Sequence, residues 1–228
     1  MQNSFPLQKL QNIKTPFYYY DMELLERTLK QVREHSQQHG FVVHYAIKSN
    51  ANPRVLEMIR SFGLGVDCVS GFEVQRALDA GFAPSGIVFA GVGKADWEIE
   101  LGLDNDIACF NVESIPELEI INELAAKKGK HAHVALRINP NVNAKTHHYI
   151  TTGLKENKFG INQWDLDKVV GVLKKLQHVS FEGIHFHIGS QITDLSSFKD
   201  LCVRVNEIQE WFIQQQLYPR VINVGGGL

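Results

Sequence analysis

Short apolar runs rich in β-branched and aromatic residues alternate with longer amphipathic stretches along most of the chain. Seven of these runs have the length and composition of buried β-strands; they span residues 41–47, 65–69, 86–90, 107–111, 133–138, 181–188 and 220–224. Apolar positions between them recur at helical spacing, which predicts helices over 22–37, 53–62, 114–126 and 197–215. Because each helix returns the chain to the same end of the sheet, this alternation predicts parallel strands.

Seven strand and helix units fit a TIM-type (β/α)8 barrel better than a small open sheet, and such a barrel needs about 250 residues. The chain has 228 residues and stops directly after the seventh predicted strand. We therefore assign residues 22–228 to an α/β barrel that is incomplete in this chain, with an open sheet as the alternative. Residues 1–21 contain the aromatic extended run PFYYY (16–20), which is either a first barrel strand or, as we prefer, part of a separate β domain.

Composition and charge narrow the class of protein. Hydrophobic residues make up 44% and charged residues 21% of the chain, as in ordinary globular domains. The formal net charge is 23 − 25 = −2 and no basic block stands out, which argues against nucleic-acid binding. The apolar runs are too short to span a membrane, no secretory signal is recognisable, and three cysteines form neither a disulfide framework nor a zinc pattern. We expect a cytoplasmic, soluble globular protein whose cysteines are reduced.

Polar residues and glycines gather where the predicted strands end. They are Lys48, Asp67, Ser70, Arg137, Asn139, His185, His187, Ser190, Gln191 and the triplet Gly225, Gly226 and Gly227. In parallel α/β folds the carboxyl ends of the strands share one face, and that face carries the active site. The sequence therefore predicts that these residues converge on one mouth.

Lys48 and the glycine triplet indicate particular chemistry. A lysine partly desolvated at a barrel mouth is a nucleophilic amine suited to Schiff-base chemistry, although a lysine on a surface loop is the simpler alternative. Gly225, Gly226 and Gly227 expose successive backbone N–H groups that can bind a phosphate, and barrel phosphate sites recur after the seventh and eighth strands. A flexible turn is the alternative for the triplet.

His185 and His187 lie two apart on one strand, so their side chains point the same way. That geometry also suits a metal pair, with Asp67 as a possible third ligand, and a metal-dependent hydrolase is a competing hypothesis. The other interpretation is that one of the two histidines packs in the core and only the other has a functional role.

Five stretches together resemble a known family. They are HYAIKSN (44–50), GVDCVSGFE (65–73), LRINPNVNAKTHHYITTGLKENKFGI (136–161), GIHFHIGSQI (183–192) and NVGGGL (223–228). In these stretches the chain resembles the pyridoxal-phosphate-dependent decarboxylases of the alanine-racemase-like fold. The third and fourth stretches indicate the branch that acts on diaminopimelate.

The resemblance implies a role for each matching position. Lys48 would hold pyridoxal 5′-phosphate covalently, His187 would stack on its ring, and Arg137 would lie close to it. Ser190 and Gly227, with Gly225 and Gly226, would bind the phosphate group. Asp67 and Glu73 would sit near the lysine and support the site, and no metal would take part.

The resemblance also implies the reaction and the assembly. The reaction would be decarboxylation of meso-2,6-diaminopimelate to L-lysine, the last step of lysine biosynthesis, in a homodimer that shares its active sites. Family members continue through an eighth strand and a C-terminal β domain, which carry further site residues that this chain would lack. The alternatives are another amino-acid decarboxylase, a non-catalytic cofactor-binding homologue, or a racemase, although SNANP (49–53) departs from the racemase pattern Ala-Asn-Ala-Tyr-Gly-His-Gly after the lysine.

Overall fold

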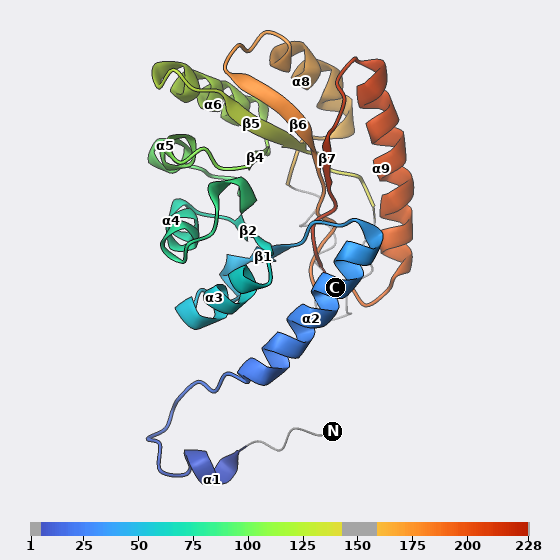
Figure 1. Ribbon diagram of the computed structural model, residues 1–228. Helices are drawn as coiled ribbons and strands as arrows, with labels where there is room; N and C mark the ends of the chain where they lie inside the picture. The colour runs from blue at the N-terminus through green and yellow to red at the C-terminus, as the bar shows by residue number, and fades with distance from the viewer. Residues whose placement is uncertain (1–5, 143–158, 228) are drawn as a thin grey trace. The chain divides into compact units, whose positions relative to one another are not determined.

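The central feature is one sheet of seven parallel strands, in the order in which they follow along the chain (Figure 1). The computed structural model describes residues 6–142 and 159–227. The strands are β1 (His44–Ala46), β2 (Gly65–Cys68), β3 (Ile87–Phe89), β4 (Cys109–Val112), β5 (Ala132–Arg137), β6 (Val179–His185) and β7 (Val221–Asn223). Every predicted strand is present and every neighbouring pair is parallel.

Helices connect the strands and surround the curled sheet (Figure 1). They are α3 (Pro53–Ser61), α4 (Gly71–Asp79), α5 (Asp96–Asp104), α6 (Ile115–Lys127), α8 (Leu166–Leu173) and α9 (Ser196–Gln214), with 3-10 turns η1 (Ile47–Ser49), η2 (Pro84–Gly86) and η3 (Gln163–Asp165). Local chemistry sets where they begin. Asn52 caps α3 by accepting from the N–H of Arg54 at 3.0 Å, and Pro53 occupies the first turn, where no hydrogen bond is lost.

The two faces of the sheet differ in composition. The face under the helices carries large apolar side chains that are fully buried, such as Phe89, Leu136 and Ile184. The opposite, inner face carries smaller residues, and Val88, Cys109 and Ala135 pack there as one cluster. Gly183 belongs to the inner face, where an added Cβ would collide with the backbone of Val221. Glycine at this position allows β7 to pair closely with β6.

The chain forms two compact units, residues 1–41 and 42–228. The first contains α1 (Leu7–Leu10) and α2 (Met22–His39), and α2 starts at the N-cap Asp21 and ends at Gly40 in the left-handed conformation. No strand forms over residues 16–20, so the sheet begins at β1, and the hypothesis of a barrel strand in that segment is wrong. Assignment of residues 1–21 to a separate β domain stays a prediction. None of the described helices is long and apolar enough to cross a membrane.

Candidate active site

The register of the sheet places polar side chains on its inner face, near the carboxyl ends of the strands. Partners across parallel strands point to the same side. Asp67 pairs with Val88, Asn111 pairs with Ala135, and Arg137 pairs with His185. Asp67, Asn111, Arg137 and His185 therefore line the same face as the Val88 cluster, toward one end of it. Asp67, Arg137 and His185 are three of the residues that the sequence places at the mouth, whereas Asn111 is not among them.

Lys48 lies in η1, directly after β1, and its side chain is exposed. The sequence predicts that this lysine is partly desolvated, but among the described residues nothing buries it, because the short turn η1 places it beyond the packed inner face. Its position still brings it to the site. The positive charge of Lys48 acts on both Asp67 and His187, lowering the pKa of each.

Asp67 is the most perturbed carboxyl group at this end of the sheet. Burial raises its pKa from 3.8 to about 6; the positive charge of Lys48 opposes this rise, and the negative charge of Glu73 adds to it. Glu73 lies in the first turn of α4 and accepts a hydrogen bond from the N–H of Val69 at 2.8 Å, while Ser70 accepts from the N–H of Glu73 at 3.2 Å. Ser70 thus caps α4, and the Glu73 side chain ties Val69 to the first turn of the helix, which together fix the loop after β2.

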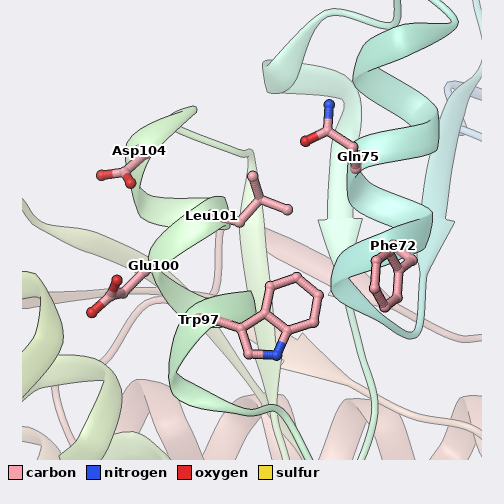
Figure 2. Close-up of a pocket in the computed structure, with 6 residues that line it drawn as sticks. All are labelled: Phe72, Gln75, Trp97, Glu100, Leu101 and Asp104. Atoms are coloured by element: carbon pink, nitrogen blue, oxygen red, sulfur yellow. The ribbon is translucent and has the colours of Figure 1, made fainter.

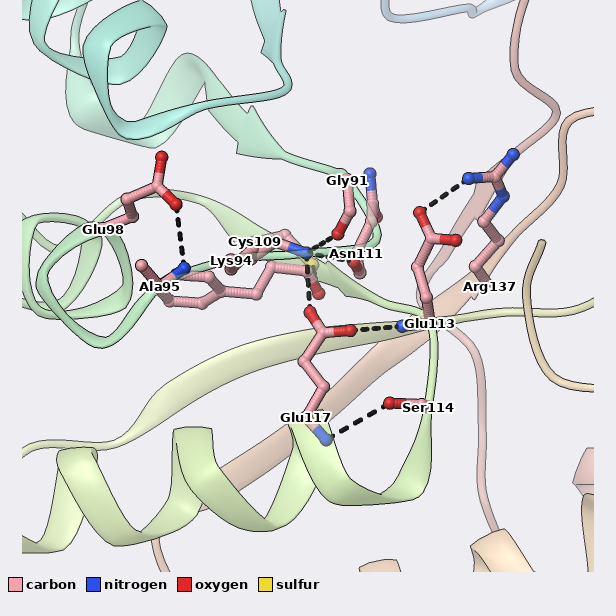
Figure 3. A network of polar contacts seen from close by, with 11 residues as sticks. Gly91, Lys94, Ala95, Glu98, Cys109, Asn111, Glu113, Ser114, Glu117 and Arg137 are labelled. Carbon is pink, nitrogen blue, oxygen red and sulfur yellow. Dashed lines mark hydrogen bonds and ion pairs between the residues drawn. The ribbon is translucent and has the colours of Figure 1, made fainter.

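Arg137 ends β5 and forms an ion pair with Glu113, with 2.6 Å between Nη1 and Oε1 (Figure 3). Its positive charge also acts on Asp67, His185 and His187. Arg137 therefore acts on all three of these polar groups, while Lys94 acts on Asp67 and His185, and Lys48 on Asp67 and His187. The sequence places it correctly at the end of its strand but does not identify Glu113 as its partner.

His185 and His187 have different environments, although both follow the inner parity of β6 and Phe186 between them is buried on the other face. His185 is buried and its Nδ1 has no hydrogen-bond partner among the described residues. His187 is less buried; burial lowers its pKa to about 4, with the charges of Arg137 and Lys48 adding to the effect. Of the two histidines, His187 is the one with ring surface left accessible to a ligand.

The glycine triplet packs against the segment that follows β6. The N–H of Ile192 donates to the carbonyl of Gly227 at 2.7 Å, which brings Ser190 and the triplet into one loop cluster. Gly225 has φ +73°, and a Cβ there would lie 2.5 Å from the carbonyl oxygen of Phe186 and 3.0 Å from His187 Nδ1. Gly226 has nothing within 4 Å of an added Cβ. The result is a backbone-lined cradle beside His187. The N–H of Gly225 in this cradle donates to Asn223 Oδ1 at 2.9 Å, so the N–H groups of Gly226 and Gly227 are those that could bind an anionic group such as a phosphate.

The remaining sequence candidates have local roles or lie outside the described residues. Asn139 accepts a hydrogen bond from the N–H of Asn141 at 2.9 Å and so shapes its own loop. Gln191 is exposed with φ +57°. The histidine pair at 147–148 falls in the segment that the structure does not describe. No group of three or more potential metal ligands forms among the described residues, so the metal hypothesis gains no ligand set from them.

A buried network that the sequence reading missed supports this end of the sheet (Figure 3). Lys94 donates from Nζ to the carbonyls of Gly91 and Asn111, each at 2.9 Å, and to Glu117 Oε1 at 2.6 Å. Its side chain is only 1% exposed. Lys94 follows β3, and Glu113 and Glu117 follow β4. The rule that polar residues after parallel strands share one end of the sheet, which identifies Lys48, could also have identified these three residues.

A separate hollow of about 330 Å³ lies between α4 and α5 in the outer layer of helices (Figure 2). Its lining is Phe72, Gln75, Trp97, Glu100, Leu101 and Asp104. The rings of Phe72 and Trp97 are 5.1 Å apart there. None of the mouth residues described above contributes to it, so it is not part of the candidate site.

Comparison with known proteins defines the class. Residues 23–228 match the family of the pyridoxal-dependent decarboxylases, pyridoxal binding domain, and the chain belongs to this family. A diaminopimelate decarboxylase from Bacteroides thetaiotaomicron is 56% identical over 229 aligned residues, covering all of this chain and 59% of that protein. One from Helicobacter pylori is 41% identical, covering 96% of this chain and 54% of its own length.

Solved structures agree with this membership. The diaminopimelate decarboxylase from Helicobacter pylori complexed with L-lysine superposes with a TM-score of 0.86 at 40% identity, covering 97% of this chain and 56% of that chain. The enzyme from M. jannaschii in complex with L-lysine gives a TM-score of 0.88 at 35% identity, covering 97% and 53%. The chain thus spans little more than half the length of the relatives that it matches.

Proposed function

We propose that the complete protein containing this chain decarboxylates meso-2,6-diaminopimelate to L-lysine with pyridoxal 5′-phosphate as cofactor. The observation that carries the proposal is the meeting of Lys48, Arg137, His187 and the glycine cradle at one end of the sheet, in a chain 56% identical to a diaminopimelate decarboxylase. In the reaction the bond to one carboxylate breaks, CO2 leaves, and the carbon that keeps the electron pair takes up a proton.

The residues of the chain fit this cofactor. The amine of Lys48 is accessible to hold its aldehyde carbon. In the cradle of Gly225, Gly226 and Gly227 the N–H of Gly225 already binds Asn223 Oδ1, which leaves the N–H groups of Gly226 and Gly227 for its phosphate. His187, neutral above about pH 4, presents an uncharged ring beside the cradle. When bound, pyridoxal phosphate accepts the electron pair that the departing CO2 leaves behind, while the protein supplies orientation and electrostatics.

The test of the proposal is direct. The complete protein, supplied with pyridoxal phosphate and meso-diaminopimelate, should release CO2 and form L-lysine in equal amounts. Ornithine, arginine and lysine offered in place of diaminopimelate should react far more slowly. Conversion of one of these three at a higher rate would assign the protein to another decarboxylase branch, and racemisation without CO2 release would assign it to a racemase.

Stacking by His187 predicts a graded effect on cofactor binding. His187→Ala should weaken the affinity for pyridoxal phosphate about tenfold, because it removes a ring contact that His187→Phe partly keeps. The dissociation constant is measured from the visible absorbance of the complete protein. His131→Ala is the matched control, since His131 is exposed and precedes β5, at the opposite end of the strands. Equal and negligible effects of both His187 substitutions would reject stacking.

We propose further that the protein is a cytoplasmic homodimer. The support is membership in the family of the pyridoxal-dependent decarboxylases, in which the resemblance implies an active site shared between two subunits. Light scattering of the complete protein should give twice the mass of one chain. A monomer that retains full decarboxylase activity would contradict an active site shared between subunits.

A further inference from the structure

Glu113 is a buried carboxylate one residue beyond β4, at the end of the sheet where the mouth residues meet. Its residue is 7% exposed and its side chain 4%. Oε1 contacts Arg137, whereas Oε2 is buried without a hydrogen-bond partner among the described residues. A buried carboxylate charge is unfavourable unless it is paired with an opposite charge, and Arg137 supplies that charge for Glu113. In return, Glu113 holds the guanidinium of Arg137 in place.

The backbone of Glu113 is anchored by the ion pair of Lys94 and Glu117 (Figure 3). Glu117 Oε2 accepts from the N–H of Glu113 at 2.8 Å, and Glu117 Oε1 binds Lys94 Nζ. Lys94 also binds the carbonyl of Asn111, so both ends of the segment 111–113 are anchored. Ser114 adds a cap by accepting from the N–H of Glu117 at 3.3 Å. This leaves the direction of the Glu113 side chain little freedom.

Arg137 has a competing carboxylate at the mouth, because its charge also acts on Asp67. A long arginine side chain without a fixed partner would be free to turn toward Asp67 or toward an incoming anion. The 2.6 Å contact with Glu113, in a pair whose side chains are 12% and 4% exposed, opposes that movement. Water competes weakly there, so the pair is stronger than one on the surface.

We propose that Glu113 is a positioning residue that fixes the guanidinium of Arg137 for cofactor binding, with the Lys94–Glu117 pair as its anchor. The inference rests on the proposed function in one respect, the role of Arg137 beside pyridoxal phosphate. The position of Arg137 itself can be tested without any cofactor.

The test compares Glu113→Gln with Glu182→Gln in the complete protein. Glu182 is the control because it is also a buried carboxylate that pairs with an arginine, Arg220, but it lies in the middle of β6, away from the mouth. It differs from Glu113 in having His133 as a second partner and in the exposure of Arg220. A loss of unfolding free energy is expected in both variants and does not discriminate between them. The first discriminating measurement is the rate at which phenylglyoxal modifies Arg137, followed by mass spectrometry with the cofactor removed. Glu113→Gln should accelerate this modification several-fold and Glu182→Gln should leave it unchanged.

The second measurement is the dissociation constant of pyridoxal phosphate in a double-mutant cycle. Glu113→Gln should weaken binding about tenfold, and should add nothing in an Arg137→Met background, because its effect passes through Arg137. Unchanged reactivity of Arg137, or an equal loss of affinity in both backgrounds, would overturn the positioning role. If the unsubstituted protein binds no pyridoxal phosphate, the proposed function fails, and the phenylglyoxal rates alone still decide whether Glu113 holds Arg137.

Discussion

Replacing Lys48 by alanine in the complete protein should reduce diaminopimelate decarboxylation at least about 10³-fold, because the amine that holds the cofactor is lost. Lys48 is suited to this role by its place in η1, at the end of the first strand, and by the exposure that lets an aldehyde reach it. The visible absorbance of the protein with pyridoxal phosphate should also disappear. Activity and absorbance spectra of the purified variant measure both effects.

The control for this prediction is Lys168→Ala, which removes an exposed lysine from α8 and should leave activity and absorbance unchanged. Borohydride reduction of the unsubstituted protein with its cofactor, followed by peptide mapping, should place the label on Lys48. A label on Lys94 or another lysine would show that the covalent site lies elsewhere. Near-normal turnover in Lys48→Ala would have the same meaning.

Replacing Asp67 by asparagine should stabilise the cofactor-free protein by about 3 kcal/mol at pH 7.5. Burial, reinforced by Glu73, raises the pKa of Asp67 to about 6, whereas in the unfolded chain the carboxyl group ionises near 3.8. The folded protein therefore binds this proton more tightly. The stability that comes from the proton is complete below about pH 4 and is lost as the pH rises through 6. Asparagine carries no charge and avoids that loss.

The pH dependence of the stability gain in Asp67→Asn distinguishes the loss of a buried charge from a change in side-chain packing. The advantage of Asp67→Asn should fall to about 1 kcal/mol at pH 4.5, where most of the folded protein already carries the proton. Urea unfolding of both proteins at the two pH values measures the difference. Asp200→Asn, at an exposed position on α9, should have no such pH-dependent advantage. A stability difference independent of pH would show that the charge on Asp67 carries no penalty.

If asparagine stabilises the fold at this position, the aspartate is present for a reason other than stability. Burial of the Asp67 carboxylate, with Glu73 nearby, is only partly offset by the charges of Lys48 and Arg137, and the expected consequence is a less stable fold. Active sites commonly sacrifice stability in this way. Asp67→Asn should therefore gain stability and lose cofactor affinity together, which can be measured on the same samples.

The sequence by itself determined the order and direction of the sheet. Alternating apolar runs and amphipathic stretches are local patterns, and each strand, from β1 at His44 to β7 at Val221, overlaps the segment that its own composition predicts. The bounds of β4, β5 and β6 are displaced by one or two residues at an end. The polar residues that follow the strands could be placed at one mouth for the same reason, because parallel strands share their carboxyl ends. Lys48, Asp67, Arg137 and His187 were all reachable by this rule.

Only the tertiary structure decided which of these side chains contact one another and how far each one is exposed to solvent. The pairing of Glu113 with Arg137 depends on the register between neighbouring strands and on the loop after β4, which no period within either segment encodes. Lys94 and Lys48 look alike in sequence, as lysines after apolar strands, yet one is buried among three acceptors and the other is exposed. The physical reason is that burial and ion pairing are set by neighbours distant along the chain, whereas strand and helix formation are set largely by the pattern within the segment itself.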